Sequence, residues 1–414
     1  MAKKDVSRIM FTLLLIGMLI LAFEFDIQPV KAEPKTVVVP DDYSRIQEAI
    51  NRANPGDTIY VKTGIYYENV VVNRSVLLVG EDGNNTIIDG SRVRTVVEIT
   101  TNDVSIVNFT IKDAGFSFGD SGIKLSGVED CKVYRNILMD NGWNGMILLY
   151  SPNNFLFENV VINSGRIGII LYDSNNNTVE KNVVMESGTY GIAIQNSNDG
   201  HIIENVVVGS SDDGIAILDS NENLVSRNIV TQGRAHGIRL DDPSDNNTIT
   251  KNTVTNNRGF GFWMWNSNNN VFHHNLCNNT SNVLVLTASD FESANTWDAG
   301  YPSGGNFWSD YIGVDERSGP YQNETGSDGI GDKPYVIAAD NQDRYPLMKP
   351  WKPLLGDIND DRIADGKDIA IVAKAFGSYL THPRWNPYAD INQDGMIEGK
   401  DVVIVAKNFG KTYP

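Results

Sequence analysis

Apolar residues in the middle of the chain come in short β-branched runs, separated by Asn, Gly, Ser and Asp. A glycine followed by an apolar residue returns every 23 residues, five times in succession, and then once after 24. Self-similarity at a fixed period of about 20–50 residues is typical of solenoid proteins. The runs show no helical period of apolar residues. The glycines are Gly122, Gly145, Gly168, Gly191, Gly214, Gly237 and Gly261.

A repeat of this length predicts three short strands and three corners in each coil, stacked into parallel sheets with strands about 4.8 Å apart. Asparagine returns at one corner of every coil, and its amide can both donate and accept hydrogen bonds, which predicts an internal ladder. A leucine-rich repeat would require Leu-x-x-Leu-x-Leu, which is absent. The sequence therefore predicts an all-β fold, a right-handed parallel β-helix. The asparagines are Asn136, Asn159, Asn182, Asn205, Asn228, Asn252 and Asn275.

The two ends of the solenoid differ from its middle. Residues 41–53 have apolar positions at helical spacing and are followed by Pro55-Gly56, which predicts an amphipathic helix. Because the terminal coils of a solenoid must cover its core, we expect this helix to be the N-terminal cap. We expect the β-helix to span residues 33–348, with an irregular C-terminal cap over residues 283–348 and a proline-containing linker over residues 349–356.

Charge and the N-terminus narrow the class of protein. A net charge of −18 argues against nucleic acid and anionic membranes as partners. Residues 1–32 combine basic residues, an apolar run from Ile9 to Phe23 and a small-residue site ending at Ala32, which predicts a secretory signal peptide, with an uncleaved anchor as the alternative. We therefore expect a secreted, extracellular or cell-surface protein. Cys131 and Cys277 lie six repeats apart, too far for a disulfide.

An acidic loop near the C-terminus occurs twice, starting at Asp357 and again 33 residues later at Asp390. Each copy places side-chain oxygens at loop positions 1, 3, 5, 9 and 12 and a backbone carbonyl at position 7, a set that suits calcium. The predicted ligands are Asp357, Asn359, Asp361, Ile363, Asp365 and Asp368 in the first loop and Asp390, Asn392, Asp394, Met396, Glu398 and Asp401 in the second.

The duplicated loop, each copy followed by one short apolar segment, resembles a type I dockerin. The resemblance implies a small α-helical calcium-binding domain over residues 357–414, with two calcium ions and a cohesin-like partner bound through residues 357–410. The first loop departs from the pattern at position 6, where Arg362 replaces the usual glycine. Both copies read Gly-Lys at positions 10 and 11, where a Ser-Thr type pair is familiar, so a different partner, or packing against the chain's own β-helix, stays open.

The repeats, followed by the Gly- and aromatic-rich segment 295–311, resemble exported β-helix proteins of the NosD type and the carbohydrate-binding and sugar-hydrolysis β-helix domains. This resemblance covers about residues 36–348 and implies a polysaccharide as ligand. It also raises a copper-associated, periplasmic alternative, for which the chain offers one local cluster: Met264, His273, His274 and Cys277. In the predicted register Met264 and His273 lie on different faces.

Positions next to the coil glycines predict a cluster of chemically active side chains on one face. By strand alternation, outward residues of three adjacent coils should gather there, flanked by aromatic rings. Carboxylates, guanidinium groups and aromatic faces are what sugar recognition uses. The predicted polysaccharide-binding residues are Tyr190, Arg239, Asp241, Arg258, Trp263 and Trp265.

Asp212 and Asp213, followed one coil later by His236, resemble the paired Asp and Gly-His-Gly of polygalacturonase-type glycosidases. The resemblance implies that Asp212 is the general acid, that Asp213 helps to activate water and that His236 holds the acid in place. That family has a third Asp where this chain has Tyr190, and its Arg-x-Lys clamp has no clear counterpart. Three functions therefore stay open: polysaccharide binding, catalysis as a glycoside hydrolase or polysaccharide lyase, and a non-catalytic surface scaffold.

Overall fold

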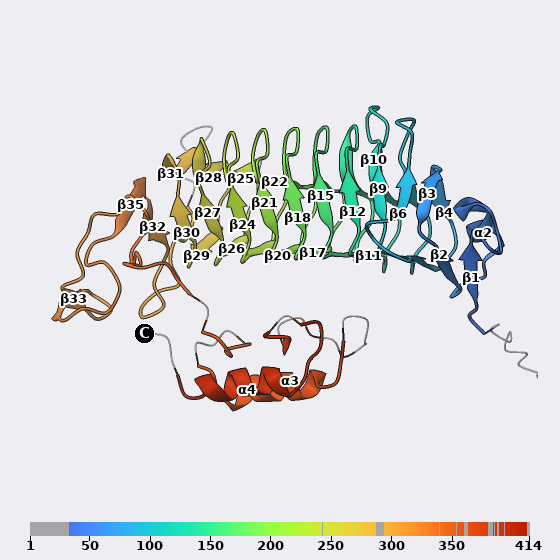
Figure 1. Ribbon diagram of the computed structural model, residues 1–414. Coiled ribbons are helices and arrows are strands. Elements are labelled where there is room, and N and C mark those ends of the chain that lie inside the picture. The colour runs from blue at the N-terminus through green and yellow to red at the C-terminus, as the bar shows by residue number, and fades with distance from the viewer. Residues whose placement is uncertain are drawn as a thin grey trace, which may run out of the picture. The chain divides into compact units, whose positions relative to one another are not determined.

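The computed structural model describes residues 33–241, 243–286, 294–338, 340–352, 354–359, 363–379, 384, 386, 389–392 and 394–411. The predicted signal peptide, Pro353, Asp361 and Arg362 lie outside the described residues. From Thr36 onward the chain forms the predicted right-handed parallel β-helix, and its coils stack along one axis from β1 to β31 (Figure 1).

Three parallel sheets, named A, B and C here, run the length of the solenoid. Sheet A has the order β1 (Thr36–Val39), β2 (Thr58–Val61), β5 (Leu77–Gly80), β8 (Ser105–Val107), β11 (Lys132–Tyr134), β14 (Phe155–Phe157), β17 (Thr178–Glu180), β20 (His201–Ile203), β23 (Leu224–Ser226), β26 (Thr248–Thr250) and β29 (Val271–His273). Sheet B has the order β3 (Gly64–Tyr67), β6 (Thr86–Asp89), β9 (Thr110–Lys112), β12 (Ile137–Met139), β15 (Val160–Ile162), β18 (Val183–Met185), β21 (Val206–Val208), β24 (Ile229–Thr231), β27 (Thr253–Thr255), β30 (Leu276–Asn278) and β32 (Phe307–Trp308). Sheet C has the order β4 (Val70–Val72), β7 (Val97–Ile99), β10 (Ser121–Ser126), β13 (Asn144–Leu149), β16 (Ile169–Tyr172), β19 (Ile192–Gln195), β22 (Ile215–Leu218), β25 (Ile238–Asp241), β28 (Phe260–Trp265) and β31 (Ser281–Leu286).

The register of sheet C confirms the period predicted from the glycines. Ile192 pairs with Ile215, which pairs with Ile238, so equivalent positions of successive coils stand directly above one another. These three side chains are fully buried and belong to one continuous core. Because side chains alternate along a strand, the neighbouring positions face outward and form columns of their own.

The predicted asparagine ladder lies at the corner between sheets A and B. The amide of Asn205 accepts the backbone N–H of Asn182 at 2.9 Å, donates to the carbonyl of Val179 at 2.8 Å and donates to the next amide, that of Asn228, at 3.0 Å. The residue before each of these asparagines has positive φ, as at Glu204 with φ 56. Such a backbone costs a non-glycine residue about 1 kcal/mol or more, and the buried amides stabilise it by satisfying the turn.

A second ladder, which the sequence reading did not identify, follows sheet C and precedes sheet A. It comprises Asn154, Asn177, Asn223, Asn247 and Asn270. Both ladders end on one strand of the C-terminal cap. The amide of Asn341 accepts from the backbone N–H of Asn295, and the carboxyl of Asp343 accepts from that of Asn306 at 2.7 Å. The indole N–H groups of two buried tryptophans bind the same two side chains. The cap strands are β33 (Arg317–Ser318), β34 (Glu324–Thr325), β35 (Tyr335–Ala338) and β36 (Asn341–Asp343).

The N-terminal cap helix is shorter than predicted. It is α2, Ile46–Arg52, and not 41–53, because Arg45 has an extended backbone and the helix starts only after it. No side chain near the start caps the helix. Instead the carboxylate of Glu68, from the first coil, accepts the N–H groups of Ile46 and Gln47 at 3.0 and 3.1 Å. A tertiary contact therefore takes the place of a local side-chain cap.

The C-terminal region contains two helices, α3 (Gly366–Ala375) and α4 (Gly399–Asn408), one after each acidic loop. They enclose a small core of their own that includes Val372 and Val405. Both helices begin with a capping box. No helix within the described ranges is long and apolar enough to cross a membrane. Cys131 and Cys277 are both free and buried.

Candidate functional site

Arg239 is the centre of the predicted cluster on the outward face of sheet C. It lies on β25, in register with Ala216 on one side and Trp263 on the other. Its guanidinium forms ion pairs with Asp241 and, at 3.4 Å, with Asp213, and its central carbon lies 4.8 Å from the centre of the Trp263 ring. A guanidinium held between carboxylates and an aromatic face is fixed in orientation, and part of it still reaches solvent.

Asp213 lies just before β22 and is fully buried. Its Oδ1 accepts the backbone N–H of His236 at 2.9 Å, and its Oδ2 faces Arg239. Burial raises the pKa of Asp213 to about 6, and the nearby Asp212 adds to the increase, while the two hydrogen bonds oppose it. Both oxygens of this carboxylate are thus used inside the protein.

His236 forms part of a row of stacked rings with Trp263 and Trp265. The imidazole lies 5.6 Å from the Trp263 ring with an interplanar angle of 11°, and Trp263 lies 6.5 Å from Trp265 at 10°. Nδ1 of His236 accepts the backbone N–H of Phe260 at 3.0 Å. Burial, aided by the charge of Arg239, lowers the pKa of His236. The ring is therefore neutral at neutral pH, with its proton on Nε2.

Two further predicted residues join the cluster and one does not. Tyr190 is half-buried, and burial raises the pKa of its hydroxyl, which also senses the charges of Arg239 and Asp212. Asp212 is half-exposed and makes no hydrogen bond with the His236 ring in the described part of the chain. Arg258 is exposed, and among the described residues its side chain contacts no other member of the cluster.

The acidic loops combine oxygen donors with an internal network. In the second loop Asp390 accepts the N–H groups of Asp394 and Gly395, and Asp401 accepts three backbone N–H groups, including that of Glu398. Lys400 forms ion pairs with Asp394 and Glu398. In the first loop Asp368 accepts the N–H groups of residues 358, 359 and 365.

The loops supply the hard oxygen donors that calcium prefers. In the described part of the chain, however, no three His, Cys, Asp or Glu side chains lie close enough together to hold a metal ion. One predicted ligand of the first loop, Asp361, is outside the described residues. The types of donor fit calcium, and in the second loop two of the predicted ligands form ion pairs with Lys400.

The solenoid and the C-terminal region each match a known protein family. The family model described as periplasmic copper-binding protein (NosD) matches residues 50–209 and 185–313, which together span more than half of the 414 residues. The chain belongs to the NosD family. Residues 355–410 match the dockerin type I domain, so the predicted resemblances to both families are confirmed.

Individual relatives of this NosD-family chain cover only parts of it. A cell surface glycoprotein of Methanothermus fervidus is 31% identical over 117 residues, which are 27% of this chain and 19% of that protein. The probable pectinesterase/pectinesterase inhibitor 6 of Arabidopsis thaliana is 34% identical over 95 residues, 21% of this chain and 15% of that protein. The chain thus spans less than a fifth of the length of these curated relatives. The Dettilon tailspike protein superposes with a TM-score of 0.51 at 15% identity over 66% of each chain, which shows the fold alone.

The family's copper description can be tested on the one cluster of soft and imidazole donors. Met264 and Cys277 are fully buried in the solenoid core, and burial raises the pKa of the Cys277 thiol far above its ordinary value. A thiolate or thioether there could not reach a metal shared with solvent. His273, which is partly exposed, and His274, which is buried, have their Nδ1 atoms 3.0 Å apart. In this NosD-family member the predicted copper cluster does not come together as a ligand set.

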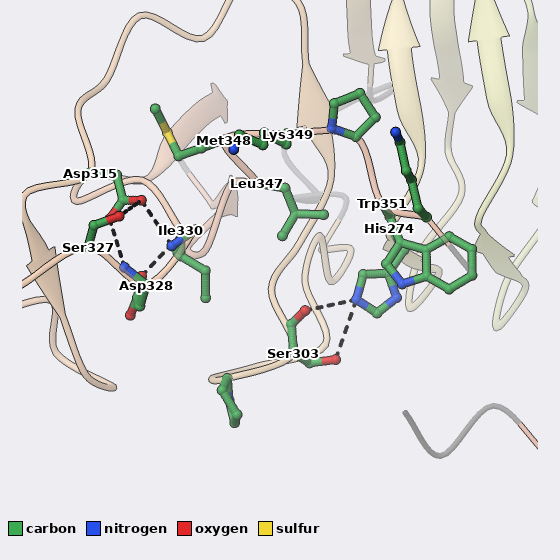
Figure 2. Close-up of a pocket in the computed structure, with 14 residues that line it drawn as sticks. His274, Ser303, Asp315, Ser327, Asp328, Ile330, Leu347, Met348, Lys349 and Trp351 are labelled. Atoms are coloured by element: carbon green, nitrogen blue, oxygen red, sulfur yellow. Dashed lines mark hydrogen bonds between the residues drawn. The ribbon is translucent and has the colours of Figure 1, made fainter. Parts of the chain in front are cut away.

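A cavity of about 620 Å³ lies at the C-terminal cap. Figure 2 shows His274 beside Trp351 at one side and Asp315 with Ser327 at the other. His274 Nε2 binds the carbonyl of Ser303 at 2.8 Å, and Asp315 binds Ser327 and nearby backbone N–H groups. The wall between them is largely apolar, with Ile330, Leu347 and Met348 among the lining residues.

Proposed function

We propose that the solenoid binds an acidic polysaccharide on the outward face of sheet C, centred on Arg239, Trp263 and Trp265, and that the C-terminal module tethers it to a partner. The observation that carries this proposal is the row of ring planes beside a fixed guanidinium. The two indole planes are within 10° of parallel, and the faces of such rings that are left open can pack against sugar rings. The guanidinium of Arg239 already binds Asp241 through Nε and Nη2 and Asp213 through Nη1, so a ligand carboxylate would bind its remaining N–H donors.

Unpaired cations near the cluster favour an acidic ligand over a neutral one. Arg234 and Arg258 are exposed and form no ion pair with any described carboxylate, although the chain carries a net charge of −18. They lie in the turns before β25 and β28, the strands that contain Arg239 and Trp263. A polymer with carboxylate groups would gain charge-assisted hydrogen bonds there.

Binding is favoured over hydrolysis by the state of Asp213. A group that activates water must reach that water, yet this carboxylate is fully buried and both oxygens are engaged. The imidazole that would hold the acid in place uses Nδ1 for the N–H of Phe260. A glycoside hydrolase or lyase acting through Asp212, Asp213 and His236 remains the second candidate, because the raised pKa of Asp213 is a property shared by catalytic carboxyls.

The rest of the proposal concerns export and attachment. In it, residues 1–32 are a signal peptide, residues 33–348 are the β-helix with its caps, residues 349–356 are a linker, and residues 357–414 bind two calcium ions. Residues 357–410 then hold a cohesin-like domain, which fixes the polysaccharide-binding face at an extracellular or cell-surface location. The match of residues 355–410 to the dockerin type I domain supports this part.

The proposal is tested with residues 33–414 in calcium against a panel of neutral and acidic polysaccharides, by isothermal titration calorimetry. We expect binding to acidic polymers that weakens at high salt and is lost in a Trp263→Ala/Trp265→Ala variant. Tyr321→Ala is the matched control, since Tyr321 is an exposed ring in the C-terminal cap. Binding to no polymer in the panel, by a protein that remains folded, would contradict the proposal.

The same samples separate binding from catalysis. New reducing ends or unsaturated products that disappear in an Asp212→Asn/Asp213→Asn variant would make the protein a hydrolase or lyase. Binding without product release is the expected result.

A further inference from the structure

A second arginine–tryptophan stack lies on the same face of the solenoid, toward its N-terminal end. The guanidinium carbon of Arg166 lies 4.9 Å from the centre of the Trp143 ring. Phe118 meets the same indole edge-on, with ring centres 6.0 Å apart at 62°, and its side chain is 89% exposed. This repeats the chemistry of the first cluster, in which Arg239 lies over Trp263 with another aromatic ring beside it.

The register places the two stacks in different columns beside the same sheet. Trp143 and Arg166 each stand two positions before a coil glycine, whereas Arg239 and Trp263 each stand two positions after one. Five coil steps separate Gly145 from Gly261, so the two tryptophans are about 24 Å apart along the axis at about 4.8 Å per coil. Both stacks therefore border sheet C, at different heights of the same solenoid.

The surface between the stacks is apolar. The outward residues of β13, β16 and β19 here, Ile147, Ile170 and Ala193, are buried. The members of their cluster that reach solvent are the partly buried Leu149, Tyr172 and Tyr190. A sugar ring can rest its C–H face on such a surface without leaving a buried charge unpaired.

Beyond the second stack the face ends in a small polar cavity of about 190 Å³. Lys124 and Glu98 line it and pair with each other at 3.2 Å. Arg94 also lines it, and this guanidinium is exposed and forms no ion pair with a carboxylate of the described chain. Arg166 is likewise exposed and unpaired apart from its aromatic contact.

We infer that Phe118, Trp143 and Arg166, with Arg94 beyond them, form a second binding site for the same acidic polysaccharide. The polymer then runs along the solenoid from one column to the other, crosses the apolar surface between the stacks and places carboxylates at both ends. This inference rests on the proposed function and adds to it the direction and minimum length of the ligand. Two linked sites on one rigid surface predict an affinity that rises with chain length until both are filled.

Length-dependent binding tests the inference. The acidic polymer that binds is cut into a trisaccharide, which can fill one stack, and a dodecasaccharide, which can reach both, and each is titrated by calorimetry. In a Trp143→Ala/Arg166→Gln variant we expect the dodecasaccharide to lose about tenfold or more in affinity, since a lost aromatic contact and a lost charge each remove a sizeable part of binding. In the same variant the trisaccharide should keep a site at the first cluster.

The Trp263→Ala/Trp265→Ala variant is the comparison. It should weaken the binding of both the trisaccharide and the dodecasaccharide. The Trp143→Ala/Arg166→Gln variant should instead remove the higher affinity of the dodecasaccharide over the trisaccharide. Equal affinity of the unmodified protein for the two lengths, or an unchanged dodecasaccharide affinity in the Trp143→Ala/Arg166→Gln variant, would overturn the second site and leave the first cluster standing. Loss of binding only through the second stack would instead overturn the proposed centre at Arg239. Far-UV circular dichroism and thermal unfolding establish that each variant is folded.

Discussion

The buried carboxyl of Asp213 should make stability depend on pH. Burial raises its pKa from an ordinary 3.8 to about 6, so the unfolded chain releases this proton at a lower pH than the folded protein does. The folded state is therefore penalised as the pH rises through this window. A shift of about two pKa units amounts to about 3 kcal/mol well above both values, of which about 2 kcal/mol develops between about pH 4.5 and 7.5.

Asp213→Asn removes the charge and can retain an oxygen that accepts the N–H of His236. Arg239 keeps its ion pair with Asp241. We expect the free energy of unfolding of the variant, relative to the unmodified protein, to be about 2 kcal/mol higher at about pH 7.5 than at about pH 4.5. Urea unfolding at the two pH values, followed by circular dichroism, measures this difference. Asp212→Asn is the matched control, because Asp212 is half-exposed. Its effect on the free energy of unfolding should differ by less than about 0.5 kcal/mol between the two pH values.

An effect of Asp213→Asn that is equal at the two pH values would refute the reasoning. It would mean that this carboxyl titrates like an ordinary exposed one and is reachable by solvent. The argument against a water-activating role would then fail as well, because that argument depends on the same burial.

The asparagine ladder should be sensitive to one amide: Asn205→Ala leaves the buried N–H of Asn182 without its acceptor and should lower the free energy of unfolding by about 2–4 kcal/mol in urea, whereas the exposed Asn323→Ala should change it by less than about 0.5 kcal/mol. Burial raises the pKa of Asp343 to about 7, so Asp343→Asn should gain stability relative to the unmodified protein as the pH rises from about 4 to 8, and a relative loss over that range would contradict the cause. Removing calcium with EGTA should reduce the helical circular dichroism signal of residues 357–410 and leave the β-sheet signal in place, and an unchanged helical signal would count against calcium as the module's structural ion.

The fold could be predicted because every coil contains the residues that specify its conformation. A glycine, an inward apolar run and a corner asparagine recur in every coil, and each coil contacts only its neighbours, so a local pattern specifies the whole stack. The second ladder was missed because Gly200 interrupts its asparagines, and Gly200 donates its own N–H to Asn223 at that level. The start of α2 was misplaced because its cap, Glu68, lies 22 residues further along the chain.

The residues of the candidate site could be predicted, but their burial and hydrogen bonds could not. Counting from the glycines placed Arg239 and Trp263 in one column, and the structure pairs them. The burial of Asp213 and the ring bond of His236 depend on how side chains of three coils pack, which no spacing encodes. The Arg166–Trp143 stack was not predicted, because the prediction was built on clustered carboxylates. Both residues nevertheless stand at the same position of successive coils, two residues before the coil glycine.

In sheet C the inward residues form the core of the fold, and the outward residues carry the chemistry of the candidate site. Along one register the inward residues Ile215, Ile238 and Phe262 stay apolar, while their outward neighbours change from Ala216 to Arg239 to Trp263. The inward side chains and the corner amides hold the coils together, so the partly exposed outward residues Arg239 and Trp263 can be replaced with little effect on stacking. Membership of a β-helix family therefore specifies the stack and leaves the ligand to the outward columns. Variants of those columns should change which polymer binds while the unfolding midpoint stays close to that of the unmodified protein.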